Sequence, residues 1–73
     1  MGKTYAVVEK HVGDDVGCAW YYDTRDHYGI YDRMMDVTGG DHEESANAAS
    51  WCELADVGET YEFREGEIRI EEG

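Results

Sequence analysis

The sequence predicts one α+β domain over residues 1–73, a small antiparallel sheet with one helix packed on one face. Three observations carry this prediction. The first 23 residues contain two runs of β-forming residues around a turn, and residues 42–57 carry apolar side chains at helical spacing. The last fifteen residues alternate apolar and charged side chains, as a half-buried hairpin does. The predicted element order is β-β-β-α-β-β.

Residues 4–12 form the first predicted strand, because valine and tyrosine dominate them. Residues 13–17 contain two glycines and two aspartates, and this composition is typical of a turn. Residues 18–23 then supply a second strand that is rich in aromatic side chains.

The next stretch, residues 28–37, fits two structures. Ile30, Met34 and Val37 would lie on one side of a helix, whereas residues 28–32 have the composition of a strand. We favour the strand, which makes it the third of the sheet.

A helix is predicted over 42–57. Asp41 follows two glycines and can cap its N-terminus, with Glu44 three positions later in the pattern of a capping box. Gly58 supplies a stop signal. Apolar side chains at positions i, i+3, i+4 and i+7 give the helix one buried face: Ala48, Trp51, Cys52 and Ala55.

A C-terminal β-hairpin is predicted over residues 60–71, with Glu65 and Gly66 as its two-residue turn. This turn sets the register. It places four apolar side chains opposite one another and pairs four charged ones with opposite signs, as cross-strand energetics favour. The predicted partners are Phe63 with Ile68, Tyr61 with Ile70, Glu62 with Arg69, and Arg64 with Glu67.

The charge of the chain is its strongest functional signal. Eighteen acidic residues against six basic ones give a net charge of −12, whereas a net charge of about 2 to 8 keeps a small domain in solution. Residues 1–40 contribute −3 and residues 41–73 contribute −9. Self-repulsion at this density destabilises the compact state. A positively charged partner would offset that repulsion.

No catalytic or metal-binding pattern accompanies this charge. The three histidines are scattered, and Cys18 and Cys52 lie too far apart in the sequence for a CxxC motif. We therefore predict a non-enzymatic protein with no cofactor and no metal, and with two buried free thiols. No apolar run reaches the roughly 20 residues of a membrane span. The absence of a signal-like N-terminal stretch predicts a cytoplasmic protein without membrane contacts.

The predicted partner is a basic, nucleic-acid-binding protein, because phosphate repulsion disfavours direct binding of nucleic acid. Exposed Tyr21 and Tyr28 would add aromatic contacts to the acidic ones. The acidic residues expected to contribute lie on the helix and around the hairpin: Glu53, Asp56, Glu59, Glu65, Glu67, Glu71 and Glu72.

In size, charge and lack of catalytic motifs, the chain resembles phage-encoded inhibitors of bacterial defence, the anti-CRISPR and DNA-mimic proteins. The resemblance covers overall character and transfers no residue. An alternative interpretation stays open at this point. The chain is then a small structural or regulatory domain, compatible with a homodimer, whose acidity serves solubility or adaptation to salt in a halophilic organism.

Overall fold

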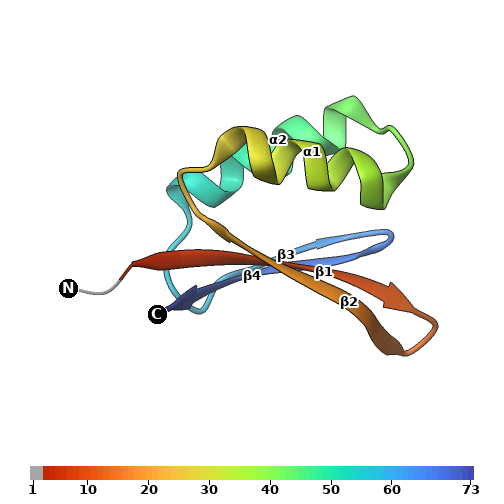
Figure 1. Ribbon diagram of the computed structural model, residues 1–73, viewed down its shortest axis with the longest axis horizontal. Helices are drawn as coiled ribbons and strands as arrows, with labels where there is room; N and C mark the ends of the chain where they lie inside the picture. Colours follow the sequence, from red (N-terminus) through yellow and green to blue (C-terminus); the bar gives the residue numbers. More distant parts are fainter. Residues whose placement is uncertain (1–2) are drawn as a thin grey trace.

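The computed structural model describes residues 3–73, apart from the side chain of Val16. Two helices lie side by side on one face of a four-stranded antiparallel sheet with the strand order β2-β1-β4-β3 (Figure 1). The α+β class and the C-terminal hairpin are therefore confirmed. The elements are β1 (Thr4–Val12), β2 (Asp15–Asp23), α1 (His27–Thr38), α2 (His42–Leu54), β3 (Thr60–Phe63) and β4 (Gly66–Glu72).

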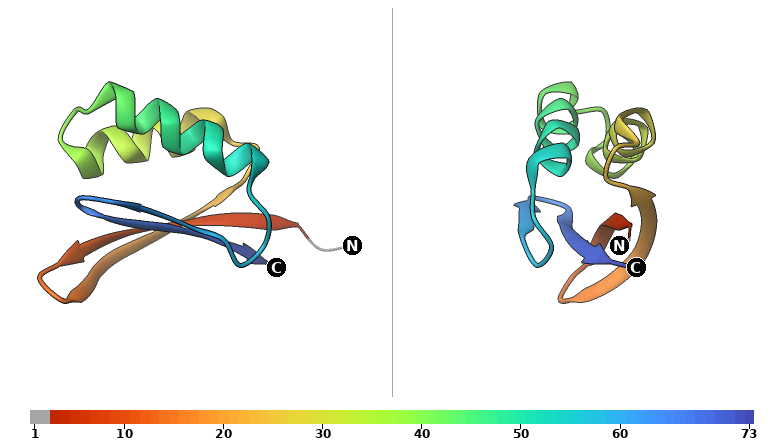
Figure 2. Two further views of the ribbon diagram at one scale, coloured as in Figure 1. Left: turned by 180° about the vertical axis from the view of Figure 1, so that it is seen from behind. Right: turned by 90° about the vertical axis from the view of Figure 1, so that its left-hand side faces the viewer.

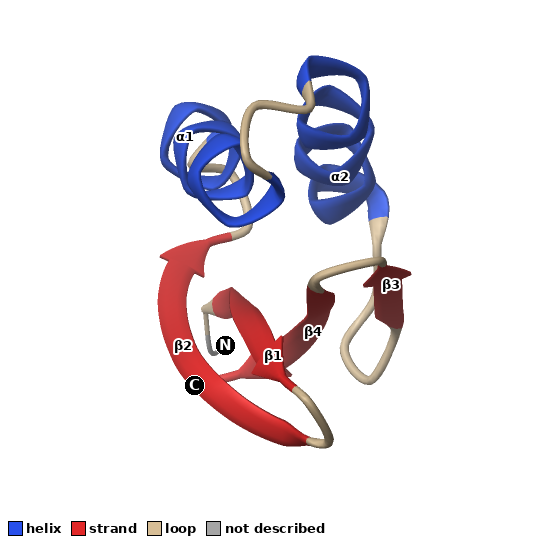
Figure 3. Cartoon of the chain, turned by 90° about the vertical axis from the view of Figure 1, so that its right-hand side faces the viewer, coloured by secondary structure: helices blue, strands red, loops and turns tan. Residues whose placement is uncertain are grey.

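The central pair of the sheet joins the first strand to the last. β1 begins and β4 ends at the same end of the sheet (Figure 2), where Gly73 N donates to Lys3 O at 2.9 Å. β2 and β3 form the two edges (Figure 3). In the described part of the chain, no helix is long and apolar enough to cross a membrane.

The prediction of a third strand over residues 28–37 is wrong, because this stretch is helix α1. Ile30, Met34 and Val37 are buried against the sheet. A strand would point Val37 to the opposite face from the other two, since side chains alternate along a strand. A helix buries all three on one stripe. Asp26 caps this helix by accepting from Gly29 N at 3.0 Å.

The one helix predicted from the sequence, over 42–57, is present as α2, but it ends at Leu54, three residues before the predicted end. Asp41 is its N-cap and accepts from Glu44 N at 3.0 Å, as predicted. The capping box is only half formed, because the Glu44 carboxylate instead accepts from the Tyr61 hydroxyl at 3.0 Å. Gly58, with φ of 94°, lies in the turn that leads to β3.

The predicted register of the C-terminal hairpin is wrong by two residues. Tyr61 lies opposite Ile68, and Glu62 lies opposite Glu67, so the turn consists of residues 64–65. Gly66 is the first residue of β4, where a Cβ atom would collide with the backbone carbonyl oxygen of Glu9. A shift of two keeps every side chain on its predicted face. It also replaces the predicted opposite-charge pairs with a pair of like charges.

The core lies between the helices and the sheet. It is built from ten buried side chains: Ala6, Val8, Ile30, Met34, Val37, Ala48, Ala49, Cys52, Ile68 and Ile70. Partly buried aromatic rings close its sides. The ring of Trp51 lies 5.4 Å from that of Tyr61, measured between centroids. The predicted packing of α2 on the hairpin is therefore present, with Trp51 half-buried at its margin.

Stability should decrease at alkaline pH because two weak acids, one on a partly buried and one on a buried side chain, have raised pKa values. Burial raises the pKa of the Tyr61 hydroxyl from 10.0 to about 12, with a further contribution from the hydrogen bond to Glu44. Burial likewise raises the pKa of the Cys52 thiol from 9.0 to about 12. The folded state therefore holds both protons more tightly than the unfolded chain does. Their contribution to stability is complete below about pH 9 and is lost as the pH rises through about 12.

Urea unfolding at several pH values in this range measures the effect. We expect the free energy of unfolding to decrease steadily above about pH 9. Tyr61→Phe removes one of the two groups, so its stability should depend less on pH than that of the wild type. An unfolding free energy that stays constant up to about pH 12 in the wild type would contradict the shifted pKa values.

Candidate functional site

The sheet face opposite the helices is not covered by any element of the described chain (Figure 1). We call this surface the open face. Strand alternation and register place eleven residues on it: Tyr5, Val7, Glu9, Ala19, Tyr21, Asp23, Thr60, Glu62, Glu67, Arg69 and Glu71. Five of these are acids and one is a base, which gives the surface a net charge of −4.

A row of three carboxylates crosses the open face. Glu67 on β4 lies directly opposite Glu9 on β1 and also directly opposite Glu62 on β3. Directly opposed Cβ atoms in antiparallel strands are about 4.5–5.5 Å apart, and like charges at this spacing destabilise the sheet. The fold therefore places negative charge here at a cost in stability.

Two basic side chains partly compensate this row. Arg69 Nη2 lies 2.6 Å from Glu9 Oε1, and the Glu9 side chain is almost fully buried. The contact is an ion pair. His11 Nε2 lies 3.4 Å from Glu67 Oε1 and forms an ion pair only when the imidazole is protonated. Glu62 has no such contact among the described residues.

Aromatic surface lies beside the acidic row. Tyr21 projects from β2 with 69% of its surface exposed. Val7 is almost fully buried between Tyr21 and Arg69, its two cross-strand neighbours. An exposed ring beside carboxylates gives the open face an apolar contact as well as negative charge, a combination found at protein interfaces.

The sequence-predicted contact residues do not form one surface. The structure brings Tyr21, Glu67 and Glu71 together on the open face. Tyr28 lies in the first turn of α1 and is 83% exposed, while Glu53 near the end of α2 lies 3.3 Å from His27 Nδ1. These two therefore belong to the helical layer, on the opposite side of the sheet.

The remaining four predicted residues lie in connections and at the end of β4. Glu59 accepts from Asp56 N at 2.7 Å within the loop between α2 and β3. Glu65 occupies the hairpin turn. Glu72 pairs with Thr4 and points, by strand alternation, to the helical side. The acids of residues 41–72 are thus divided among three regions of the molecule.

Sequence reasoning missed four charged residues of the open face: Glu9, Asp23, Glu62 and Arg69. Alternation along the first strand was a usable signal, since Tyr5, Val7 and Glu9 share one parity and Ala6 and Val8 share the other. Glu62 was assigned to an ion pair because the predicted register placed it opposite Arg69. Glu9 and Asp23 come from the less acidic half of the chain, where no acidic contact residue was expected.

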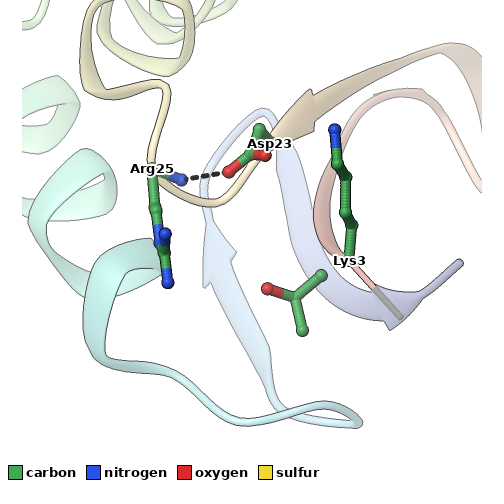
Figure 4. Close-up of a pocket in the computed structure, with 4 residues that line it drawn as sticks. Lys3, Asp23 and Arg25 are labelled. Atoms are coloured by element: carbon green, nitrogen blue, oxygen red, sulfur yellow. Dashed lines mark hydrogen bonds between the residues drawn. The ribbon is translucent and has the colours of Figure 1, made fainter. Parts of the chain in front are cut away.

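A small pocket of about 210 Å³ lies at the end of the sheet and is lined by Lys3, Thr4, Asp23 and Arg25. Asp23 lies between Lys3 and Arg25, and its carboxylate accepts from Arg25 N at 2.9 Å (Figure 4). The pocket contains no nucleophile paired with a base. Within residues 3–73, no three His, Cys, Asp or Glu side chains converge in a way that could hold a metal ion.

The cysteines differ in their surroundings. Both are free thiols, as predicted. The prediction that both are buried is wrong for Cys18, which is exposed on edge strand β2. Only Cys52 lies in the core, where burial raises its thiol pKa to about 12 and leaves it uncharged at neutral pH. A thiol in this state is a poor nucleophile.

Comparison of the chain with models of protein families, with curated proteins and with solved structures finds no match.

Proposed function

We propose that this protein is a non-enzymatic binding protein whose open face occupies the basic, nucleic-acid-binding surface of a partner protein. This is the mode of action of DNA-mimic and anti-CRISPR inhibitors encoded by phages. A cytoplasmic location would place it with such a partner. The observation that carries the proposal is the row Glu9, Glu67 and Glu62 on an uncovered sheet face.

The physical argument rests on the cost of that row. Directly opposed carboxylates destabilise the sheet. Lysine or arginine side chains of a partner would remove this repulsion on binding, so association recovers what folding loses. The net charge of −12 also accelerates encounter with a basic surface and repels free nucleic acid. The protein would therefore compete with nucleic acid and would not bind it.

Capture of the partner from host lysate, followed by mass spectrometry, provides the binding assay. The test variant replaces Glu62, Glu67 and Glu71 with glutamine, which removes three charges from the open face. The matched control replaces Asp32 with asparagine and Glu43 and Glu53 with glutamine, three exposed acids of the helices. Both variants carry a net charge of −9, so only the place of the lost charge differs.

We expect the open-face variant to bind the purified partner about tenfold more weakly, and the helix variant to bind nearly as well as the wild type. Affinity should decrease with added salt, and DNA should compete. Equal weakening in both variants would show that net charge matters and the open face does not. If neither variant nor added salt changes the affinity, the proposed electrostatic interface is wrong. The acidity of the chain then serves solubility or salt adaptation.

A further inference from the structure

Edge strand β2 carries backbone groups that no other strand of residues 3–73 uses. It pairs with β1 on one side only and forms the outer edge of the sheet (Figure 3). The register with β1 shifts at Gly17, which has no partner residue. Cys18–Asp23 therefore forms the regular part of this edge, and it contains neither the lysine nor the proline that commonly protects an edge.

Two backbone hydrogen bonds show which N–H and C=O groups of β2 point away from β1. Thr24 N donates to Thr4 O, and His11 N donates to Glu65 O. Even-numbered residues of β1 therefore bond to β2, and odd-numbered ones bond toward β4. By the same alternation, Ala19 and Tyr21 direct both N–H and C=O outward from the β2 edge. Their side chains lie on the open face.

The two faces beside this edge differ in charge. On the helical side, Arg33 Nε donates to the Tyr22 hydroxyl at 2.9 Å, and the guanidinium carbon lies 4.3 Å from the centre of the Trp20 ring. The open-face side carries Asp23 and the net −4 of the surface defined above. An added strand would therefore place its cations on the open-face side and apolar residues beside Trp20 and Tyr22.

We propose that an extended segment of the basic partner adds to β2 as a fifth strand along Cys18–Asp23, with Lys or Arg at alternate positions. This inference rests on the proposed function and specifies how its partner would be held. Strand addition supplies backbone hydrogen bonds at Ala19 and Tyr21, and the alternating cations supply the selectivity. A second copy of the chain is a poorer occupant, because it would bring another −12 to the same edge.

The test uses two synthetic peptides of one composition. The first, acetyl-Lys-Val-Lys-Thr-Lys-Val-Lys-amide, places all four lysines on one face of a strand. The second, acetyl-Lys-Lys-Val-Thr-Val-Lys-Lys-amide, divides them between both faces. Binding to the full chain is followed by amide chemical shifts and hydrogen exchange. We expect the first peptide to bind more tightly and to slow exchange of the outward amides of Ala19 and Tyr21.

A pair of proline variants separates the edge from the rest of the sheet. Ala19→Pro removes an outward N–H from β2, while Thr60→Pro does the same on the opposite edge, at β3. Proline is tolerated where the N–H of an edge strand faces solvent. Ala19→Pro should weaken binding of the first peptide about tenfold, and Thr60→Pro should not weaken it. If the Ala19→Pro variant does not fold, the deciding measurement is hydrogen exchange at Ala19 and Tyr21 in the wild type with the first peptide.

The outcomes distinguish this inference from the proposed function. Salt-sensitive binding that is weakened by the open-face glutamine variant, with unchanged exchange at Ala19 and Tyr21, would overturn the added strand and support the acidic surface. Absence of binding by either peptide at low salt would count against both. If, without peptide, the protection of these two amides from exchange increases with protein concentration, a second copy of the chain occupies the β2 edge. That result would overturn the inference.

Discussion

Gly66→Ala should destabilise the protein more than alanine at any other glycine that the structure describes. The new Cβ would collide with the backbone carbonyl oxygen of Glu9 and would lie 3.2 Å from Lys10 Cα. These are backbone atoms of the neighbouring central strand, so no side-chain rotation relieves the contact. We expect a loss of about 3 kcal/mol, the upper part of the range for overpacking. Urea unfolding followed by circular dichroism measures it.

That loss is large for this chain. A 73-residue domain has roughly 4–11 kcal/mol of stability in total, at about 0.05–0.15 kcal/mol per residue. Gly13→Ala is the matched control, because a Cβ there meets no atom within 4 Å and strains only a φ of 65°. It should cost about 1–2 kcal/mol. A Gly66→Ala protein as stable as the wild type would show that β1 and β4 are not as close as described.

Ile68→Ala should cost about 2–5 kcal/mol, as is typical for truncating a fully buried isoleucine. Ile68 has no exposed surface and lies on β4 between Val8 of β1 and Tyr61 of β3. Its side chain thus links three strands to the helical layer. The midpoint of thermal unfolding should decrease by about 4–8 °C for each kcal/mol lost.

Ile68→Val is the graded control and should cost only about 0.5–1.5 kcal/mol. If Ile68→Ala and Ile68→Val unfolded at the same temperature as the wild type, Ile68 would not occupy the core.

Local signals in the sequence were enough for most elements. Asp41 and Glu44 marked the start of α2 correctly, because an N-cap depends on residues three positions apart. The strand prediction for residues 28–37 is wrong because it relied on the preference of Tyr28 and Tyr31 for strands. The spacing of Ile30, Met34 and Val37 was the better guide, since burial of one stripe outweighs intrinsic preference.

The hairpin register could not be deduced from the hairpin alone. Opposite-charge pairing favoured a turn at Glu65 and Gly66, yet exposed ion pairs contribute only about 0–1 kcal/mol. Gly66 instead satisfies a contact with Glu9, more than fifty residues earlier in the chain. The open face was missed for the same reason, because its row of acids combines β1, β3 and β4.

The pairing of β1 with β4 also determines when the sheet can form. The helices and the two hairpins, β1–β2 and β3–β4, join segments that are close in sequence. The central ladder instead joins residues 4–10 to residues 66–72, and closing so long a loop is slow. During synthesis on the ribosome, Ala6 and Val8 therefore stay without their partners Ile70 and Ile68 until residues 68–70 have emerged. A nascent chain that stalls before residue 66 would lack β4 and would leave Ala6 and Val8 without their partners.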